Sequence, residues 1–127
     1  MAAVESALLA ALAASLANLR WKVQYREPSS SSRPDIVVTS SDGKTYVLEV
    51  KLGEGRAHFA SIAQVESLAN ELRERQGEDV VPILVTNLDV PPTLSAVADR
   101  VGVEVVEAKG STDEMTESVV NHLESGS

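Results

Sequence analysis

The sequence contains no cysteine, which excludes disulfide bonds, Cys-containing zinc sites and thiol nucleophiles. It contains two histidines, too few for a histidine-rich metal cage and a poor basis for a serine triad, which needs a histidine base. Aromatic residues make up 3% of the chain, so base stacking is not expected to be the main mode of any nucleic-acid recognition. Any metal site should therefore use oxygen ligands, and the absence of cysteine fits a cytoplasmic protein.

Long hydrophobic runs are also missing. The Ala/Leu-rich stretch Ala7 to Leu19 is too short to span a bilayer, and no Lys or Arg precedes it as in a targeting signal. We therefore expect a buried helix there and no membrane partner. With 127 residues, of which 43% are hydrophobic and 24% charged, the chain has the size and composition of a single globular domain, residues 1–127.

The net charge of −8 is unevenly distributed along the chain. From Arg20 to Arg56, seven basic residues accompany five acidic ones, whereas from Ala57 onward four basic residues accompany thirteen acidic ones. Nucleic-acid binding normally requires a basic surface, so an acidic chain is unusual for that function. Charge alone does not separate a nucleic-acid-binding protein from an ordinary acidic one.

The hydrophobic pattern predicts an α/β domain with a mixed sheet and helices on both faces. The expected elements are a helix at 2–18, strands at 21–27, 35–39 and 44–51, a helix at 57–75, a strand at 80–86, a helix at 91–101, a strand at 103–106 and a last helix capped by Ser111 and Glu114. Strand 80–86 is almost continuously apolar, as expected for a parallel strand covered on both faces. The expected inward-facing helical residues are Leu9, Leu12, Leu16 and Leu19; Phe59, Ile62, Val65, Ala69 and Leu72; Leu94, Val97 and Val101; and Met115, Val119 and Leu123.

The second and third strands are expected to form a hairpin around Ser41-Asp42-Gly43. A three-residue loop with Gly43 in the left-handed conformation pairs Asp35 with Glu49, whereas a two-residue turn would put Asp35 opposite Val50. We choose the three-residue loop. Because strand side chains alternate, it places Asp35, Glu49 and Lys51 on one face of the sheet. The opposite face would pack under helices through Ile36, Val38, Tyr46, Leu48 and Val50.

Asp35, Glu49 and Lys51 form the candidate site. Two carboxylates that face each other in a half-buried sheet repel unless a cation lies between them. Mg²⁺ or Mn²⁺ suits such oxygen ligands and leaves positions for water and phosphate, while the Lys51 ammonium would orient the water and stabilise charge on a phosphate oxygen. This set predicts metal-assisted phosphodiester hydrolysis. The alternative is a surface hairpin with an ordinary cross-strand Glu/Lys arrangement, which does not account for Asp35.

The motif Pro34-Asp35, thirteen residues, then Glu49-Val50-Lys51 resembles the signature of the PD-(D/E)XK, or restriction-endonuclease-like, nucleases. In that superfamily a helix precedes three meandering strands, which carry the motif, and a helix and a buried strand follow. The predicted elements from Glu5 to Val106 have the same order. Residues 80–107 are also similar to the last part of Mrr-like and Holliday-junction-resolvase-like members.

The resemblance implies roles for individual residues. Asp35, Glu49 and the Val50 carbonyl would hold Mg²⁺ or Mn²⁺, Lys51 would position the attacking water, and Gln64 and Glu5 would assist. Each assisting residue has an alternative explanation. Glu5 lies in the first turn of a helix, where the helix dipole favours an acid, and Gln64 is explained equally well as a solvated helix residue.

The resemblance implies an endonuclease that acts on DNA. An RNA-directed nuclease is not distinguished, because nothing in the sequence recognises a 2′-hydroxyl. One active site cuts one strand, so cleavage of both strands favours a homodimer, to which Met115, Val119 and Leu123 of the last helix would contribute. The alternative function is that of a non-catalytic member of the same fold, a binding or assembly module.

Overall fold

The computed structural model describes residues 2–25, 36–76 and 79–126. The elements are α1 (Ala2–Asn18), β1 (Lys22–Tyr25), β2 (Ile36–Thr39), β3 (Thr45–Lys51), α2 (Phe59–Gln76), β4 (Val80–Thr86), α3 (Pro92–Val101), β5 (Glu104–Glu107) and α4 (Thr112–Gly126). Their order is the predicted one, and the α/β class is confirmed. Among these helices, none is both long enough and apolar enough to cross a membrane.

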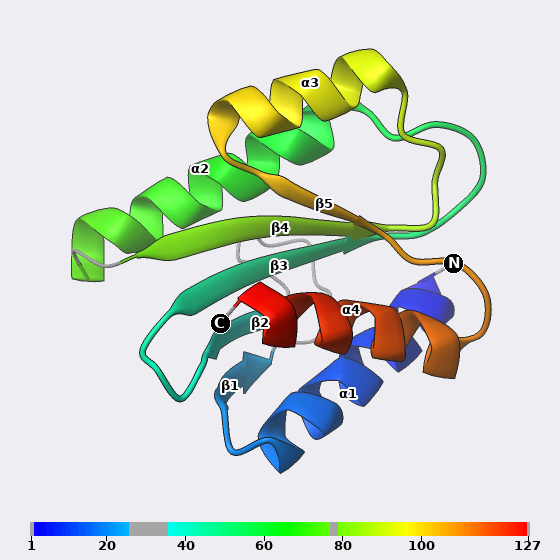
Figure 1. Ribbon diagram of the computed structural model, residues 1–127. Helices are drawn as coiled ribbons and strands as arrows, with labels where there is room; N and C mark the ends of the chain where they lie inside the picture. Colours follow the sequence, from blue (N-terminus) through cyan, green and yellow to red (C-terminus); the bar gives the residue numbers. More distant parts are fainter. Residues whose placement is uncertain (1, 26–35, 77–78, 127) are drawn as a thin grey trace.

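The strands form one mixed five-stranded sheet in the order β1-β2-β3-β4-β5. β1, β2 and β3 pair antiparallel, and β3, β4 and β5 pair parallel. The parallel connections run through α2 and α3, which cover one face of the sheet, while α1 and α4 cover the other (Figure 1). The centre of the sheet is therefore buried on both sides, which agrees with the apolar sequence of β4.

Two hydrophobic cores lie on opposite faces of the sheet. On the side of α1 and α4, the helices pack on alternate residues of β2 and β3, namely Ile36, Val38, Tyr46, Leu48 and Val50, all of which are buried as predicted. On the side of α2 and α3, the core includes Val47, Ile62, Val65, Leu84, Leu94 and Ala98. Strand alternation therefore sends Glu49 and Lys51, which follow Val47 at two-residue spacing, toward the α2 face.

The predicted hairpin register is confirmed over the part of the hairpin that the structure describes. Val37 pairs with Val47, and the Ser40 N–H donates to the Lys44 carbonyl at 2.9 Å. Gly43 has a φ of 90°, the left-handed conformation that the three-residue loop requires. This register excludes the two-residue turn.

Three residues expected to face the core are partly exposed instead. Leu19 is 37% exposed, Phe59 55% and Val101 36%. Leu19 follows the end of α1, Phe59 is the first residue of α2, and Val101 is the last residue of α3. A side chain in a terminal turn has helical neighbours on one side only, so a periodicity that is correct inside the helix overestimates burial at its ends.

The last helix begins with the predicted capping box. The Ser111 N–H donates to Glu114 Oε1 at 2.9 Å, and the Glu114 N–H donates to Ser111 Oγ at 3.1 Å. The hydrogen bonds to the Ser111 backbone and hydroxyl hold the pKa of the Glu114 carboxyl below its usual value. The prediction that Met115, Val119 and Leu123 of α4 face inward is confirmed, whereas the prediction that they contribute to a homodimer interface is wrong. Met115 is 3% exposed and Val119 and Leu123 are fully buried, because these side chains pack within the core of their own chain.

Candidate active site

Glu49 is a buried acid in the central strand of the sheet. Its side chain is 4% exposed, on the face that α2 covers, and its backbone pairs with Leu84 of β4. Burial disfavours an ionised carboxylate unless hydrogen bonds or a cation compensate. A hydrogen-bonding side chain is therefore expected beside it, and α2 provides one.

Gln64 of α2 makes that contact. Its Nε2 donates to Glu49 Oε1 across 3.3 Å, although Gln64 is an exposed residue. Of the two explanations that the sequence left open for Gln64, the structure therefore favours a contact, here with the predicted site residue Glu49. An amide is a neutral donor, so it orients the carboxylate without supplying a positive charge.

Glu5 reaches the same end of β3 from the other face of the sheet. Its Oε2 accepts a hydrogen bond of 2.9 Å from the N–H of Leu52, the residue directly after the strand. The two residues are 47 positions apart in the sequence, so this contact ties the first turn of α1 to the end of β3. Glu5 lies in the first turn of α1, where the helix dipole favours an acid. At the same position its carboxylate accepts the hydrogen bond from the Leu52 N–H, so the two observations are compatible.

Lys51 and Val50 complete the part of the predicted set that the structure describes. Lys51 is the last residue of β3, half-buried, and two residues from Glu49, so both side chains leave the strand on the same face. Val50 is 3% exposed, with its side chain in the α1–α4 core. Asp35 lies outside the described residues. The pairing of Ile36 with Leu48, one position further into the hairpin, is the register from which its place opposite Glu49 is predicted.

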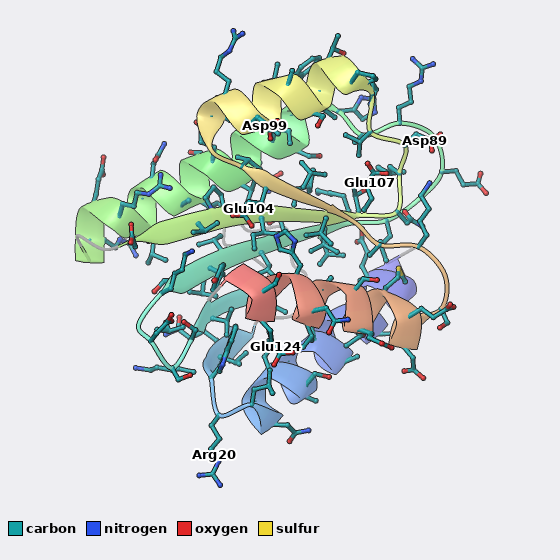
Figure 2. All side chains as sticks on the ribbon, viewed as in Figure 1. Arg20, Asp89, Asp99, Glu104, Glu107 and Glu124 are labelled. Carbon is teal, nitrogen blue, oxygen red and sulfur yellow. The ribbon has the colours of Figure 1, made fainter. Side chains whose placement is uncertain are left out.

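The connectors that follow β3 and β4 are joined beside this strand end. The Gly53 N–H donates to Asn87 Oδ1 at 2.9 Å. Asp89 and Gly55 are linked by a backbone hydrogen bond of 2.9 Å, and the Ala57 N–H donates to the Asp89 carbonyl at 2.8 Å. Figure 2 shows Asp89 at the end of the sheet where β4 and β5 finish. Loops at the carboxyl ends of parallel strands are a common location for functional sites. Here the connectors after β3 and β4 are held together by the hydrogen bonds given above.

Sequence reasoning missed Asn87, which holds the Gly53 connector in place. The available signal was its position directly after a buried strand, where a polar side chain lies at the carboxyl edge of the sheet. Many polar residues at this position only end a strand, so the signal does not identify a hydrogen-bond partner.

Within residues 2–25, 36–76 and 79–126, no three His, Asp or Glu side chains are grouped closely enough to hold a metal ion.

Comparison with known proteins gives matches among solved structures. No family model matches the chain. No curated protein matches it. The chain is similar to EndoMS in a complex with double-stranded DNA, at 28% identity and a TM-score of 0.54 over 67% of this chain and 35% of EndoMS. It is similar to a repair endonuclease from Pyrococcus abyssi, at 25% identity and a TM-score of 0.58 over 76% of this chain and 44% of that one.

A protein of unknown function shares the fold at 15% identity and a TM-score of 0.58, over 90% of this chain and 67% of the other. The chain thus spans less than half the length of the two endonucleases that it matches. Together the matches support a restriction-endonuclease-like fold for the helix and strand order described above, and structural kinship to DNA repair endonucleases.

Proposed function

We propose that this chain is a metal-dependent nuclease that hydrolyses phosphodiester bonds of DNA. The observation that carries the proposal is the Glu49 carboxylate, 4% exposed in the central strand and contacted by Gln64 across 3.3 Å. A buried acid is costly to the fold, and such groups concentrate at functional sites. Structural kinship to DNA repair endonucleases, one of them solved with double-stranded DNA, supports DNA as the substrate.

The available donors fit a hard divalent cation. Asp35 and Glu49 would supply carboxylate oxygens and Val50 a backbone carbonyl, the ligand types that Mg²⁺ and Mn²⁺ prefer. When bound, the ion would act as a Lewis acid toward a phosphate oxygen. The observed hairpin register supports this set, because the same register, if continued by one position beyond Ile36 and Leu48, would bring Asp35 opposite Glu49.

The other residues have positioning roles in this proposal. Gln64 holds the Glu49 carboxylate in one orientation through its amide, and Glu5 holds the end of β3 by accepting from the Leu52 N–H. Lys51 lies between these two contacts along the strand. Its ammonium would orient the attacking water and offset negative charge that develops on the phosphate.

A cleavage assay tests the proposal directly. Purified protein is incubated with supercoiled plasmid and with single-stranded DNA in millimolar Mn²⁺, with EDTA as the metal-free arm. We expect cleavage in Mn²⁺, none in EDTA, and loss of cleavage in Glu49→Gln, which keeps the side-chain volume but removes the charge that a cation needs. Glu71→Gln, at an exposed position of α2, is the matched control and should cleave like wild type. Equal cleavage by wild type and Glu49→Gln would reject the assignment.

The net charge of −8 favours one alternative, a non-catalytic module of the same fold. The effect of Mn²⁺ on the thermal stability of the protein distinguishes the two functions. If the site binds Mn²⁺ in the folded state only, then Mn²⁺ at a hundred times its Kd stabilises the fold by about 2.7 kcal/mol. For a domain of this size that corresponds to a rise in Tm of roughly 10 °C. Asp35→Asn should abolish the rise, whereas Asp99→Asn, exposed on α3, should keep it. An unchanged Tm in wild type over a millimolar titration would favour the module.

A further inference from the structure

The layer formed by α1 and α4 contains a groove on the face of the sheet opposite to that of Glu49. The groove has a volume of about 300 Å³, and Ala11, Val120 and Ser15 line it together with the acids Asp113 and Glu117. The two helices lie side by side in Figure 1, with their N-terminal ends toward the same end of the sheet. An occupant of this groove would not approach the candidate active site, so binding there is independent of the proposed function.

The solvent side of α1 lacks the charged residues that an exposed helix normally carries. No charged residue occurs between Glu5 and Arg20. The outward positions at three- and four-residue spacing are Ala7, Ala10, Ala14 and Ala17, all exposed. A helix that is apolar on every side is typically covered on every side. The sheet covers the inner face of α1, and the alanine face has the small side chains that allow another helix to pack closely.

The charged side chains that line the groove are acidic. The sequences of α1 and α4 contain no Lys or Arg, while Asp113 and Glu117 stand exposed at its rim. These carboxylates would repel the phosphates of a nucleic acid, so charge disfavours nucleic acid as the occupant. A second copy of this chain, docked by a two-fold axis, would bring the same acidic rim against itself. Charge complementarity therefore favours a partner that is basic.

A second, separate hollow lies further along α4. Asp113, Glu117, Val120 and Glu124 follow at three- and four-residue spacing, so they lie along one face of the helix. Glu124 extends from α4 toward the end of α1 (Figure 2). There it lines a hollow of about 420 Å³ with Trp21, Ser41 and Asp42.

Trp21 gives this hollow an aromatic wall. Its ring stacks on Tyr46 with a centroid distance of 6.2 Å and an interplanar angle of 8°. The Lys44 ammonium lies over the Tyr46 ring of this pair, 5.6 Å from its centroid. An indole beside carboxylates likewise suits a guanidinium or ammonium group, through cation–π attraction and ion pairing. From Asp113 to Glu124 the helical rise is about 16 Å, the length of roughly eleven residues of a partner helix.

We propose that the groove between α1 and α4, together with the separate Trp21 hollow further along α4, docks a basic amphipathic helix of a partner protein. The apolar stripe of that helix lies over Ala11 and Val120, and its flanking Lys and Arg side chains pair with Asp113 and Glu117. A basic side chain near one end of the partner helix lies against Trp21.

Selection from a random library tests this proposal with a defined probe. A phage-displayed library of 15-residue peptides is panned against the immobilised full chain, and enriched peptides are synthesised and titrated by fluorescence anisotropy. We expect enriched sequences with apolar residues at three- and four-residue spacing, flanked by Lys or Arg, that become helical on binding. Enrichment of neutral or acidic sequences, or no enrichment, would overturn the proposal.

Matched variants locate the binding surface. Ser15→Arg places bulk and positive charge in the groove and should weaken binding by about tenfold or more, because it blocks a central contact. Glu117→Lys reverses a rim charge and should weaken binding about fivefold. The controls Ser67→Arg and Glu71→Lys make the same changes at exposed positions of α2 and should bind like wild type. Circular dichroism and Tm check that all four variants fold.

Three outcomes of the variant series contradict the proposal. Equal weakening by the groove and control variants would mean that only overall charge matters. Unchanged binding in both groove variants would place the peptide elsewhere. A wild-type dimer in sedimentation velocity that Ser15→Arg converts to a monomer would identify a second copy of the chain as the occupant.

Discussion

Replacing Lys51 with alanine is expected to lower the rate of DNA cleavage by about 10²–10⁴-fold, the usual contribution of one positioned proton-transfer or charge-stabilising group. Lys51 lies at the end of β3, two residues from Glu49 on the same strand face. Its proposed role concerns the attacking water and the phosphate, not the metal ligands. The Mn²⁺-dependent rise in Tm should therefore be retained in Lys51→Ala while cleavage is lost. Single-turnover cleavage and thermal melting of the same preparation measure the two effects.

The control for this prediction is Lys109→Ala. The Lys109 ammonium contacts Asp89 at 3.4 Å, and both side chains are more than half exposed. Lys109→Ala therefore changes the net charge of the protein by the same amount as Lys51→Ala without removing a proposed site residue. Lys51→Arg should stay impaired, because a planar guanidinium does not reproduce the position of a compact ammonium. Wild-type rates in Lys51→Ala, or equal losses in Lys51→Ala and Lys109→Ala, would remove Lys51 from the mechanism.

The hairpin was predictable because its determinants are local. Gly43 is the residue that allows the left-handed conformation, and a three-residue loop then determines which side chains of β2 and β3 share a face. The buried strand β4 was predictable for a similar reason, since an almost continuous apolar run is compatible with few environments other than a sheet interior. In both cases a short segment contains all the information.

The contacts of the candidate site were predictable only in part. The resemblance to a nuclease motif pointed to Gln64, and the structure brings its amide to Glu49. The contact between Glu5 and the Leu52 N–H joins residues 47 positions apart, and it depends on how α1 crosses the sheet. No local pattern contains that crossing. The role of Asn87 depends likewise on the path of a connector that belongs to another strand.

The burial of apolar side chains could be predicted by face but not by extent. Met115, Val119 and Leu123 share one side of α4, and from sequence that side suits a core as well as a homodimer interface. Which one applies depends on the partner surface, and α1 with the sheet supplies it within the same chain. At helix ends, periodicity also fails because it does not indicate where the neighbouring elements stop.

Two leucines that the sequence assigned to the same stripe of α1 should respond very differently to truncation. Leu12 of α1 is fully buried in the core that α1 forms with the sheet and α4, whereas Leu19 lies after the helix and is 37% exposed. Leu12→Ala should lower the free energy of unfolding by about 2–5 kcal/mol, since the packed surroundings relax only partly around the cavity. Leu19→Ala removes the same atoms from a partly solvated position and should cost less than about 1 kcal/mol.

Urea denaturation measures both variants on the same scale, and an unchanged m-value ensures that the midpoints report stability. Because the Glu5 carboxylate is held at the end of β3 by the same helix that Leu12 anchors, Leu12→Ala should also weaken the attachment of α1 to that strand end. In the cleavage assay its rate should therefore fall at temperatures where most molecules remain folded, whereas Leu19→Ala should cleave like wild type. Equal destabilisation by the two substitutions would mean that α1 does not pack on the sheet through the face described above.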